Sequence, residues 1–152
     1  MRIRRFRKQD AKKVSYLVKQ AQLITLKDYY PKKIIDWFCK RNSSSRIIAK
    51  SRQTEFFVAV EKGRILGING LKENQVRKFY VNPRCQGKGV GRKLMENIEK
   101  IAKKRKIRKL VVHSSLYAEG FYKRMGFRRI KKLHQKFGKF KFDEILMEKK
   151  LK

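Results

Sequence analysis

The sequence predicts one α/β (α+β) domain with a mixed, mostly antiparallel sheet of six to seven strands, flanked by about four helices. Three observations predict this fold class. Short segments with strand-like alternation are interspersed with segments that carry apolar residues at helical spacing. The 152 residues, 41% of them hydrophobic, suffice to bury one core. No internal repeat or flexible linker divides the chain, so we expect a single domain over residues 1–152.

The N-terminal part is predicted to form one strand and two helices. Arg2–Arg7 is the expected first strand. Asp10 can cap the helix that follows, because apolar residues recur at helical spacing from Ala11 to Ala21. Pro31 opens a second helix, since proline is favoured in the first turn. The polar run 42–45 is expected to end that helix.

Three further strands are predicted in the middle of the chain. Residues 56–61 and 64–71 are strand-like, and Lys62-Gly63 between them indicates a hairpin. A turn at 72–75 leads into the strand 76–81. Asn82-Pro83 ends this strand, because proline cannot continue a central ladder.

The C-terminal half begins with the clearest amphipathic helix, which starts at Val90 and carries an apolar stripe from Leu94 to Ala102. After it we expect a short strand, a short helix and two terminal strands that are separated by a basic loop. In chain order these elements are 109–113, 118–125, 128–133, the loop 134–141, and 142–148.

The most informative motif is Gln86-Gly87-Lys88-Gly89-Val90-Gly91, between a strand and a helix. Its alternating glycines leave backbone N–H groups uncovered at a helix N-terminus, where the helix dipole favours an anion such as a diphosphate. The motif is not a P-loop, because Gly91 is followed by Arg92 and Lys93, and it is not G-x-G-x-x-G. By itself the motif leaves a purely structural turn as an equal alternative.

A second motif follows one strand later, in which Phe121-Tyr122 is followed after three residues by Gly126-Phe127. Together with Gln86, Gly89 and Gly91, it resembles the GNAT superfamily of N-acetyltransferases. That family combines a Gln/Arg-x-x-Gly-x-Gly/Ala pyrophosphate turn with a Phe-Tyr-x-x-x-Gly-Phe segment. The resemblance is strong over residues 54–133 and extends to the whole chain. It is closest to small uncharacterised bacterial and archaeal members.

The resemblance implies an acyltransferase that uses acetyl-CoA, needs no metal, and transfers the acetyl group to a primary amine by direct attack in a ternary complex. The coenzyme would lie between two splayed parallel strands, 76–81 and 109–113. A backbone N–H near Val81 would stabilise the oxyanion, and Tyr122 would act as general acid. The residues implied in coenzyme binding are Phe79, Tyr80, Val81, Gln86, Gly87, Lys88, Gly89, Val90, Gly91, Arg92, Ser115 and Tyr122.

The sequence departs from the family at two positions. Ser115 stands where many members have an asparagine that contacts the pantetheine, and Val76 stands where many have a glutamate base. Glu73 and His113 are candidate bases. Each could equally be structural, and a chain of water molecules is a third alternative.

The sequence leaves the acceptor open among a small amine, a polyamine and a protein N-terminus. Aromatic residues that could line its pocket are Tyr29, Tyr30, Trp37, Phe140 and Phe142. The competing function is a non-catalytic coenzyme- or RNA-binding module. Retention of Tyr122 beside an intact glycine turn favours the enzyme.

The composition limits which partners and which cellular location we expect for the protein. With 44 Lys and Arg against 12 Asp and Glu, the net charge is +32, spread along the whole chain. We interpret this charge as a compositional bias that attracts nucleic acids nonspecifically, because no RNA-binding motif concentrates it. We expect a cytoplasmic protein without a membrane anchor, either monomer or homodimer. Cys39 and Cys85 have no metal-site spacing.

Overall fold

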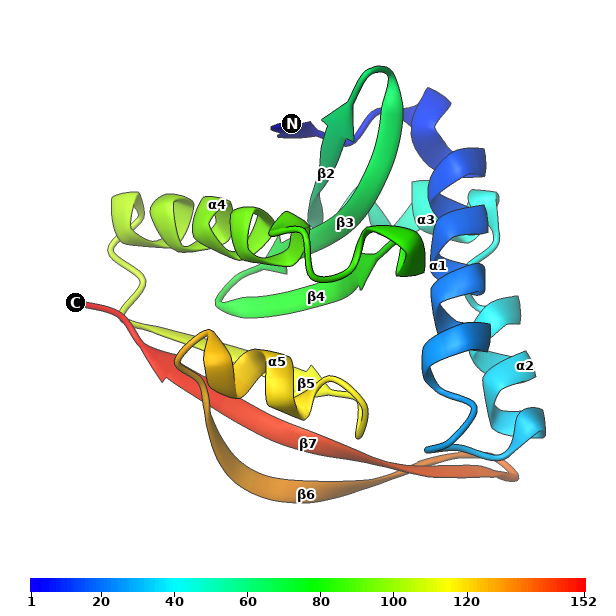
Figure 1. Cartoon of the computed structure of the whole chain (residues 1–152). Coiled ribbons are helices and arrows are strands. Elements are labelled where there is room, and N and C mark those ends of the chain that lie inside the picture. The colour runs from blue at the N-terminus through cyan, green and yellow to red at the C-terminus, as the bar shows by residue number, and fades with distance from the viewer.

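A seven-stranded sheet runs through the protein in the order β1-β2-β3-β4-β5-β7-β6 (Figure 1). The computed structural model describes all 152 residues. All neighbouring strands are antiparallel except β4 and β5. The strands are β1 Arg2–Arg5, β2 Glu55–Glu61, β3 Arg64–Lys72, β4 Gln75–Val81, β5 Lys109–Ser114, β6 Arg128–Phe137 and β7 Phe140–Lys150. The expected mixed, mostly antiparallel sheet is confirmed.

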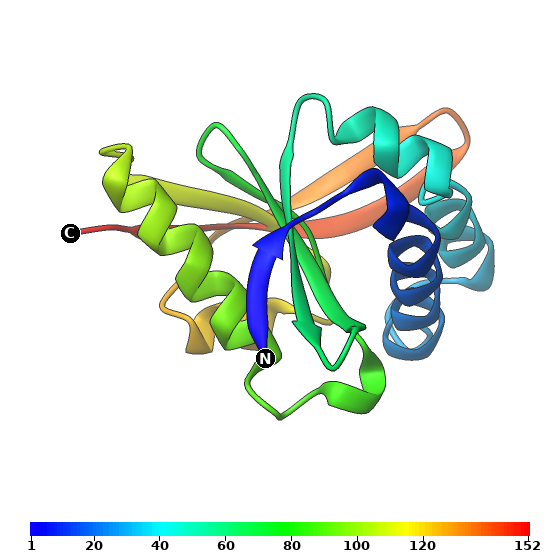
Figure 2. The ribbon, with the colours of Figure 1, turned by 90° about the horizontal axis from the view of Figure 1, so that it is seen from above.

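Five α-helices cover the two faces of the sheet. Figure 2 shows α4 and α5 on one face and α1, α2 and α3 on the other. Their bounds are α1 Ala11–Thr25, α2 Lys32–Lys40, α3 Ser44–Lys50, α4 Val90–Lys104 and α5 Glu119–Arg124. Two short 3-10 helices, Lys8–Asp10 and Pro83–Cys85, precede α1 and the glycine-rich turn. None of the helices is long and apolar enough to cross a membrane.

The alternation of β2 explains why helices pack on both faces. Phe56 and Val58 belong to a buried cluster with residues of α1 and α3. Phe57, which points the other way, packs with Met95 and Ile98 of α4. Burying both faces of a central strand in this way is worth roughly 1.5–3 kcal/mol for each large apolar side chain.

The run 42–45 ends α2 as expected, since α2 stops at Lys40, but an unexpected helix, α3, begins there. Ser43 caps α3, because its hydroxyl oxygen accepts a hydrogen bond from Arg46 N–H at 3.4 Å. Other local expectations were wrong. The basic segment 134–141 is a hairpin and not a loop. Strand β6 continues to Phe137, and β7 begins at Phe140 after a turn at Gly138 with φ 59°.

The exposed side chains of β6 explain the error, because an edge strand with basic residues on both faces shows no apolar alternation. The first strand also ends earlier than expected, at Arg5. Asp10 precedes α1 as predicted, but its carboxylate binds Arg4 and the N–H of Arg7, and caps no N–H of α1.

The sheet opens between β4 and β5. These two strands pair only at Gln75↔Val111 and Val76↔Val112, and beyond these pairs they diverge (Figure 1). Strand β4 also carries a bulge, since Arg77 lies opposite Gly70 whereas Tyr80 lies opposite Ile68. Lys78, at φ 45°, is in the bulge. The splay and the bulge together shape the site described next.

Candidate active site

The glycine-rich turn presents a series of unpaired backbone N–H groups. The N–H of Cys85 donates to Asn82 O at 2.8 Å, and that of Lys93 donates to Gly89 O at 3.1 Å. Between them, no N–H group of residues 86–92 bonds to another backbone group. No acidic residue lies in the first turn of α4. This combination of free N–H groups, helix dipole and local positive charge is suited to a diphosphate.

The glycines of the turn are required for two different structural reasons. Gly87 and Gly89 have φ of 79° and 83°, where any side chain would be strained even though the space around them is open. Gly91 is constrained by space, because a Cβ there would lie 2.9 Å from the ring of Phe121. Gln86 accepts a hydrogen bond from Tyr117 at 2.9 Å, which ties the turn to the segment before α5.

A cleft of about 700 Å³ extends from the β4–β5 splay to the face covered by α1 and α2. Of the predicted site residues, the structure brings Phe79, Tyr80, His113, Ser115 and Tyr122 together in its lining. The glycine turn lies outside this lining. Glu73 also lies outside it, exposed in the β3–β4 turn with φ 55°.

Tyr122 is 5% exposed and packs edge-on against Phe79, Phe121 and Phe127. Burial, together with the neighbouring Tyr80 phenol, raises the pKa of Tyr122 well above its ordinary value. The phenol therefore stays protonated at neutral pH. A protonated hydroxyl at the wall of the cleft can donate a hydrogen bond or a proton to a bound group.

Two further hydrogen-bond donors come from the splayed strands, one from the backbone of β4 and one from the side chain that follows β5. Because Asn82 N–H donates to Leu66 O on β3, the N–H of Val81 points to the opposite edge of β4, where the sheet is open. Ser115 accepts a hydrogen bond from Ala118 N–H at 3.1 Å, which leaves its own O–H free to donate. Both donors are therefore available to a ligand between the strands.

His113 lies in the cleft with its Nδ1 3.8 Å from Glu144 Oε1, too far for a direct hydrogen bond. Burial, and to a lesser degree the charge of Arg77, lowers the pKa of His113 below 6.5. The imidazole is therefore neutral at pH 7. Glu144 of β7 accepts a hydrogen bond from Gln135 at 3.1 Å, and burial raises the pKa of its carboxyl group.

Three of the aromatic residues predicted to line an acceptor pocket, Tyr30, Trp37 and Phe142, line this cleft. Phe140 stacks on Trp37 at 5.1 Å from behind the lining, and Tyr29 packs against Tyr117 away from it. The Tyr30 hydroxyl accepts from Leu116 N–H and donates to Asp143 O, which joins the segments that form this end of the cleft.

Sequence reasoning missed Glu144 and a group of basic residues in the cleft, among them Arg41 and Lys78. In a chain with 44 Lys and Arg residues, no local signal singles out the few that point inward. Lys78 depends on the β4 bulge, and Glu144 depends on the hairpin that was expected to be a loop. The acidic pair Asp143-Glu144, directly before the apolar residues 145–147, was the one available signal.

Comparison with known proteins agrees with this geometry. A family model described as an acetyltransferase (GNAT) domain matches residues 25–151. An uncharacterised N-acetyltransferase of Chlorobaculum tepidum is 31% identical over 83 residues. That match covers 51% of this chain and 52% of the relative, so the chain aligns with about half the length of this curated relative.

Solved structures share the fold over nearly the whole chain. A GCN5-related N-acetyltransferase from Rhodopseudomonas palustris has a TM-score of 0.93 at 20% identity, covering 99% of this chain and 95% of that one. The PaiA N-acetyltransferase from Thermoplasma acidophilum, in complex with coenzyme A, has a TM-score of 0.80 at 22% identity, covering 98% of each chain. The family match over most of the sequence, on a fold with this splayed sheet and glycine turn, shows that the chain belongs to the GNAT acetyltransferase family.

Proposed function

We propose that the protein is an acetyl-CoA-dependent N-acetyltransferase, formed by a single domain over residues 1–152, that acetylates a primary amine in a ternary complex. The observation that carries this proposal is the series of free N–H groups at residues 86–92, beside an open β4–β5 edge whose cleft contains a protonated Tyr122. These features fit a diphosphate, an extended arm and a leaving thiolate respectively.

The roles of the residues follow from what acetyl transfer requires. The N–H groups of the turn would hold the diphosphate, and the Ser115 hydroxyl would contact the pantetheine arm. The amine forms a C–N bond with the thioester carbon, and the C–S bond breaks. The Val81 N–H would stabilise the charge that develops on the carbonyl oxygen. Tyr122, as general acid, would donate the hydrogen bond of its protonated hydroxyl, and then its proton, to the sulfur as the C–S bond breaks.

His113 is the base that the geometry favours over Glu73. Both side chains are exposed, but His113 lines the cleft and is neutral at pH 7, whereas Glu73 lies outside the lining. Neutral imidazole can accept the amine proton directly or through one water molecule. Glu144, 3.8 Å from the ring, would stabilise the imidazolium that results.

The coenzyme part of the proposal is tested by calorimetric titration with acetyl-CoA. We expect one-to-one binding at roughly 0.3 M salt, where the Debye length is below about 8 Å and general attraction to the +32 charge is weakened. ATP is the control anion, because it carries phosphates but no pantetheine arm. Equal, weak binding of both ligands would mean that the turn is only structural.

The base is tested by the pH dependence of kcat/KM. A histidine acts as a base only when deprotonated, so we expect wild-type activity to fall as the pH drops through the lowered His113 pKa, below 6.5. His113→Ala should lose this step and about 10²-fold of the rate. Glu73→Gln is the matched control and should keep the wild-type profile, and the acceptor's own ionisation affects all three proteins equally. Superimposable profiles for His113→Ala and wild type would leave deprotonation to water.

A further inference from the structure

One wall of the cleft carries only positive charge. It is formed by residues from the end of α2, the end of α3, and the β3–β4 region. Its basic members are Arg41, Lys50, Lys72, Arg77 and Lys78. Glu144 of β7 is the single carboxylate among all the lining residues, and the charge of Arg41 acts on it. We call these five basic residues the cationic wall.

None of the five residues of the cationic wall has a carboxylate partner. Lys78 donates to the amide oxygen of Asn42, and Arg77 donates to Gln75 at 2.8 Å. Lys72 is 3.5 Å from the amide oxygen of Gln53. The Arg41 guanidinium lies over the Trp37 ring, 4.6 Å from its centroid. Neutral oxygens and aromatic faces orient these cations without neutralising them.

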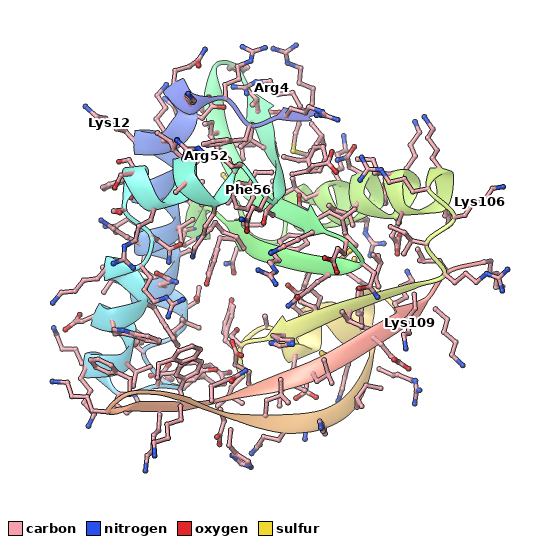
Figure 3. The ribbon with its side chains drawn as sticks, turned by 180° about the vertical axis from the view of Figure 1, so that it is seen from behind. Arg4, Lys12, Arg52, Phe56, Lys106 and Lys109 are labelled. Carbon is pink, nitrogen blue, oxygen red and sulfur yellow. The ribbon has the colours of Figure 1, made fainter.

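The lack of a carboxylate partner does not by itself set the wall apart, because 44 Lys and Arg residues face only 12 Asp and Glu residues and most of the basic side chains are unpaired. Some basic residues are paired. Arg4 makes a two-pronged contact with Asp10, and Lys149 contacts Glu99. Many other basic side chains extend outward into solvent, as Lys12 and Lys106 do in Figure 3. The cationic wall is distinct because its five basic residues line one concave site, whereas many of the others point into solvent or pair with carboxylates.

Lys78 is the innermost member of the wall. The β4 bulge places it on the same face as Arg77, and its backbone adopts φ 45°, which is unusual for lysine. Burial, and then the nearby charges of Lys50 and Arg41, lowers the pKa of Lys78 to about 7. Burial and neighbouring arginines also lower the pKa of Lys50. A bound anion would relieve this repulsion.

We infer that the acceptor is a small primary amine that also carries an anionic group, a carboxylate or a phosphate, held by the cationic wall while the amine faces His113. The inference rests on the proposed acetyltransferase function and names its substrate class. A guanidinium pre-oriented on an aromatic ring, beside flexible ammonium groups, suits either oxyanion. A cleft of about 700 Å³ that must also admit the coenzyme arm favours a small acceptor.

The test compares matched pairs of amines that differ only in the anionic group. One arm uses β-alanine and β-alaninamide, and the other uses O-phosphoethanolamine and ethanolamine. Each is titrated into the protein saturated with coenzyme A, and each is assayed for acetylation. We expect the anionic member of one pair to bind at least tenfold more tightly. A difference in the β-alanine pair would identify the anionic group of the acceptor as a carboxylate, and a difference in the O-phosphoethanolamine pair would identify it as a phosphate. Equal affinities in both pairs, or no binding at all, would overturn the inference.

Substitutions then locate the effect. Lys78→Met should raise the KM of the anionic acceptor about tenfold, because the innermost cation of the wall is lost. A tenfold change corresponds to about 1.4 kcal/mol. The substitution should also remove the difference in affinity within the pair. Lys106→Met removes the same charge outside the cleft and should change neither. Lys50→Met, at the exposed rim, is a second variant in case Lys78→Met does not fold. Full discrimination in both wall variants would contradict the inference.

The outcome also separates this inference from the proposed function. If acetyl-CoA binds and neutral amines are acetylated as well as anionic ones, the acetyltransferase function stands and the substrate class fails. If acetyl-CoA does not bind, the proposed function itself fails.

Discussion

Replacing Tyr122 by phenylalanine should lower turnover by about 10²-fold or more while leaving the affinity for acetyl-CoA unchanged, as expected for loss of a general acid. The ring would still fill the space between Phe79, Phe121 and Phe127, so packing is preserved. Only the hydroxyl at the wall of the cleft is lost. Steady-state kinetics give turnover, and calorimetry gives the affinity.

The control for this experiment is Tyr16→Phe, which removes a hydroxyl from a side chain that is 69% exposed on α1. We expect wild-type turnover in that variant. If Tyr122→Phe also keeps wild-type turnover, Tyr122 has no part in the chemistry and is only a packing residue. A loss of acetyl-CoA affinity would instead assign it to binding.

Gly89→Ala should weaken acetyl-CoA binding at least about tenfold, because each hydrogen bond to a charged group contributes about 1.5–3 kcal/mol. Gly89 adopts φ 83° at the N-terminus of α4, and a side chain forces the turn away from this conformation. The N–H groups of residues 86–92 would then no longer converge on one anion. Calorimetric titration with acetyl-CoA measures the loss.

Gly63→Ala is a matched control for this change. Gly63 lies in the β2–β3 turn with φ 75°, and like Gly89 it has open space where the new Cβ would stand. Both substitutions should therefore lower the free energy of unfolding by a similar amount, roughly 1 kcal/mol. Only Gly89→Ala should affect coenzyme binding. If both variants bind acetyl-CoA like the wild type, the turn does not hold the diphosphate.

The parts of the site that the sequence predicts are those encoded by contiguous residues. The turn at 86–91 and the pair Phe121-Tyr122 have the expected places, because glycine conformations and helix starts depend on local chemistry. Four of the predicted coenzyme-binding residues, Phe79, Tyr80, Ser115 and Tyr122, lie together in the lining of the cleft. The two splayed strands follow from the family resemblance.

The missed parts depend on contacts that are distant in sequence. Lys78 enters the cleft because β4 has one more residue than β3 at the bulge, which alternation alone cannot indicate. Glu144 faces His113 because β7 pairs with β5 in a particular register. Helix α3 was missed because a serine such as Ser43 is equally compatible with the end of one helix and with the N-cap of the next.

The splay between β4 and β5 has a consequence for the stability of the whole protein. The sheet is continuous there through only two residue pairs, so its two parts share few ladder bonds at their common boundary. A donor substrate bound in that gap would take the place of a missing strand and join the two parts. Its binding free energy would then add to the free energy of unfolding, in proportion to the logarithm of its concentration. In a cell short of acetyl-CoA, the enzyme would be not only idle but also easier to unfold and degrade.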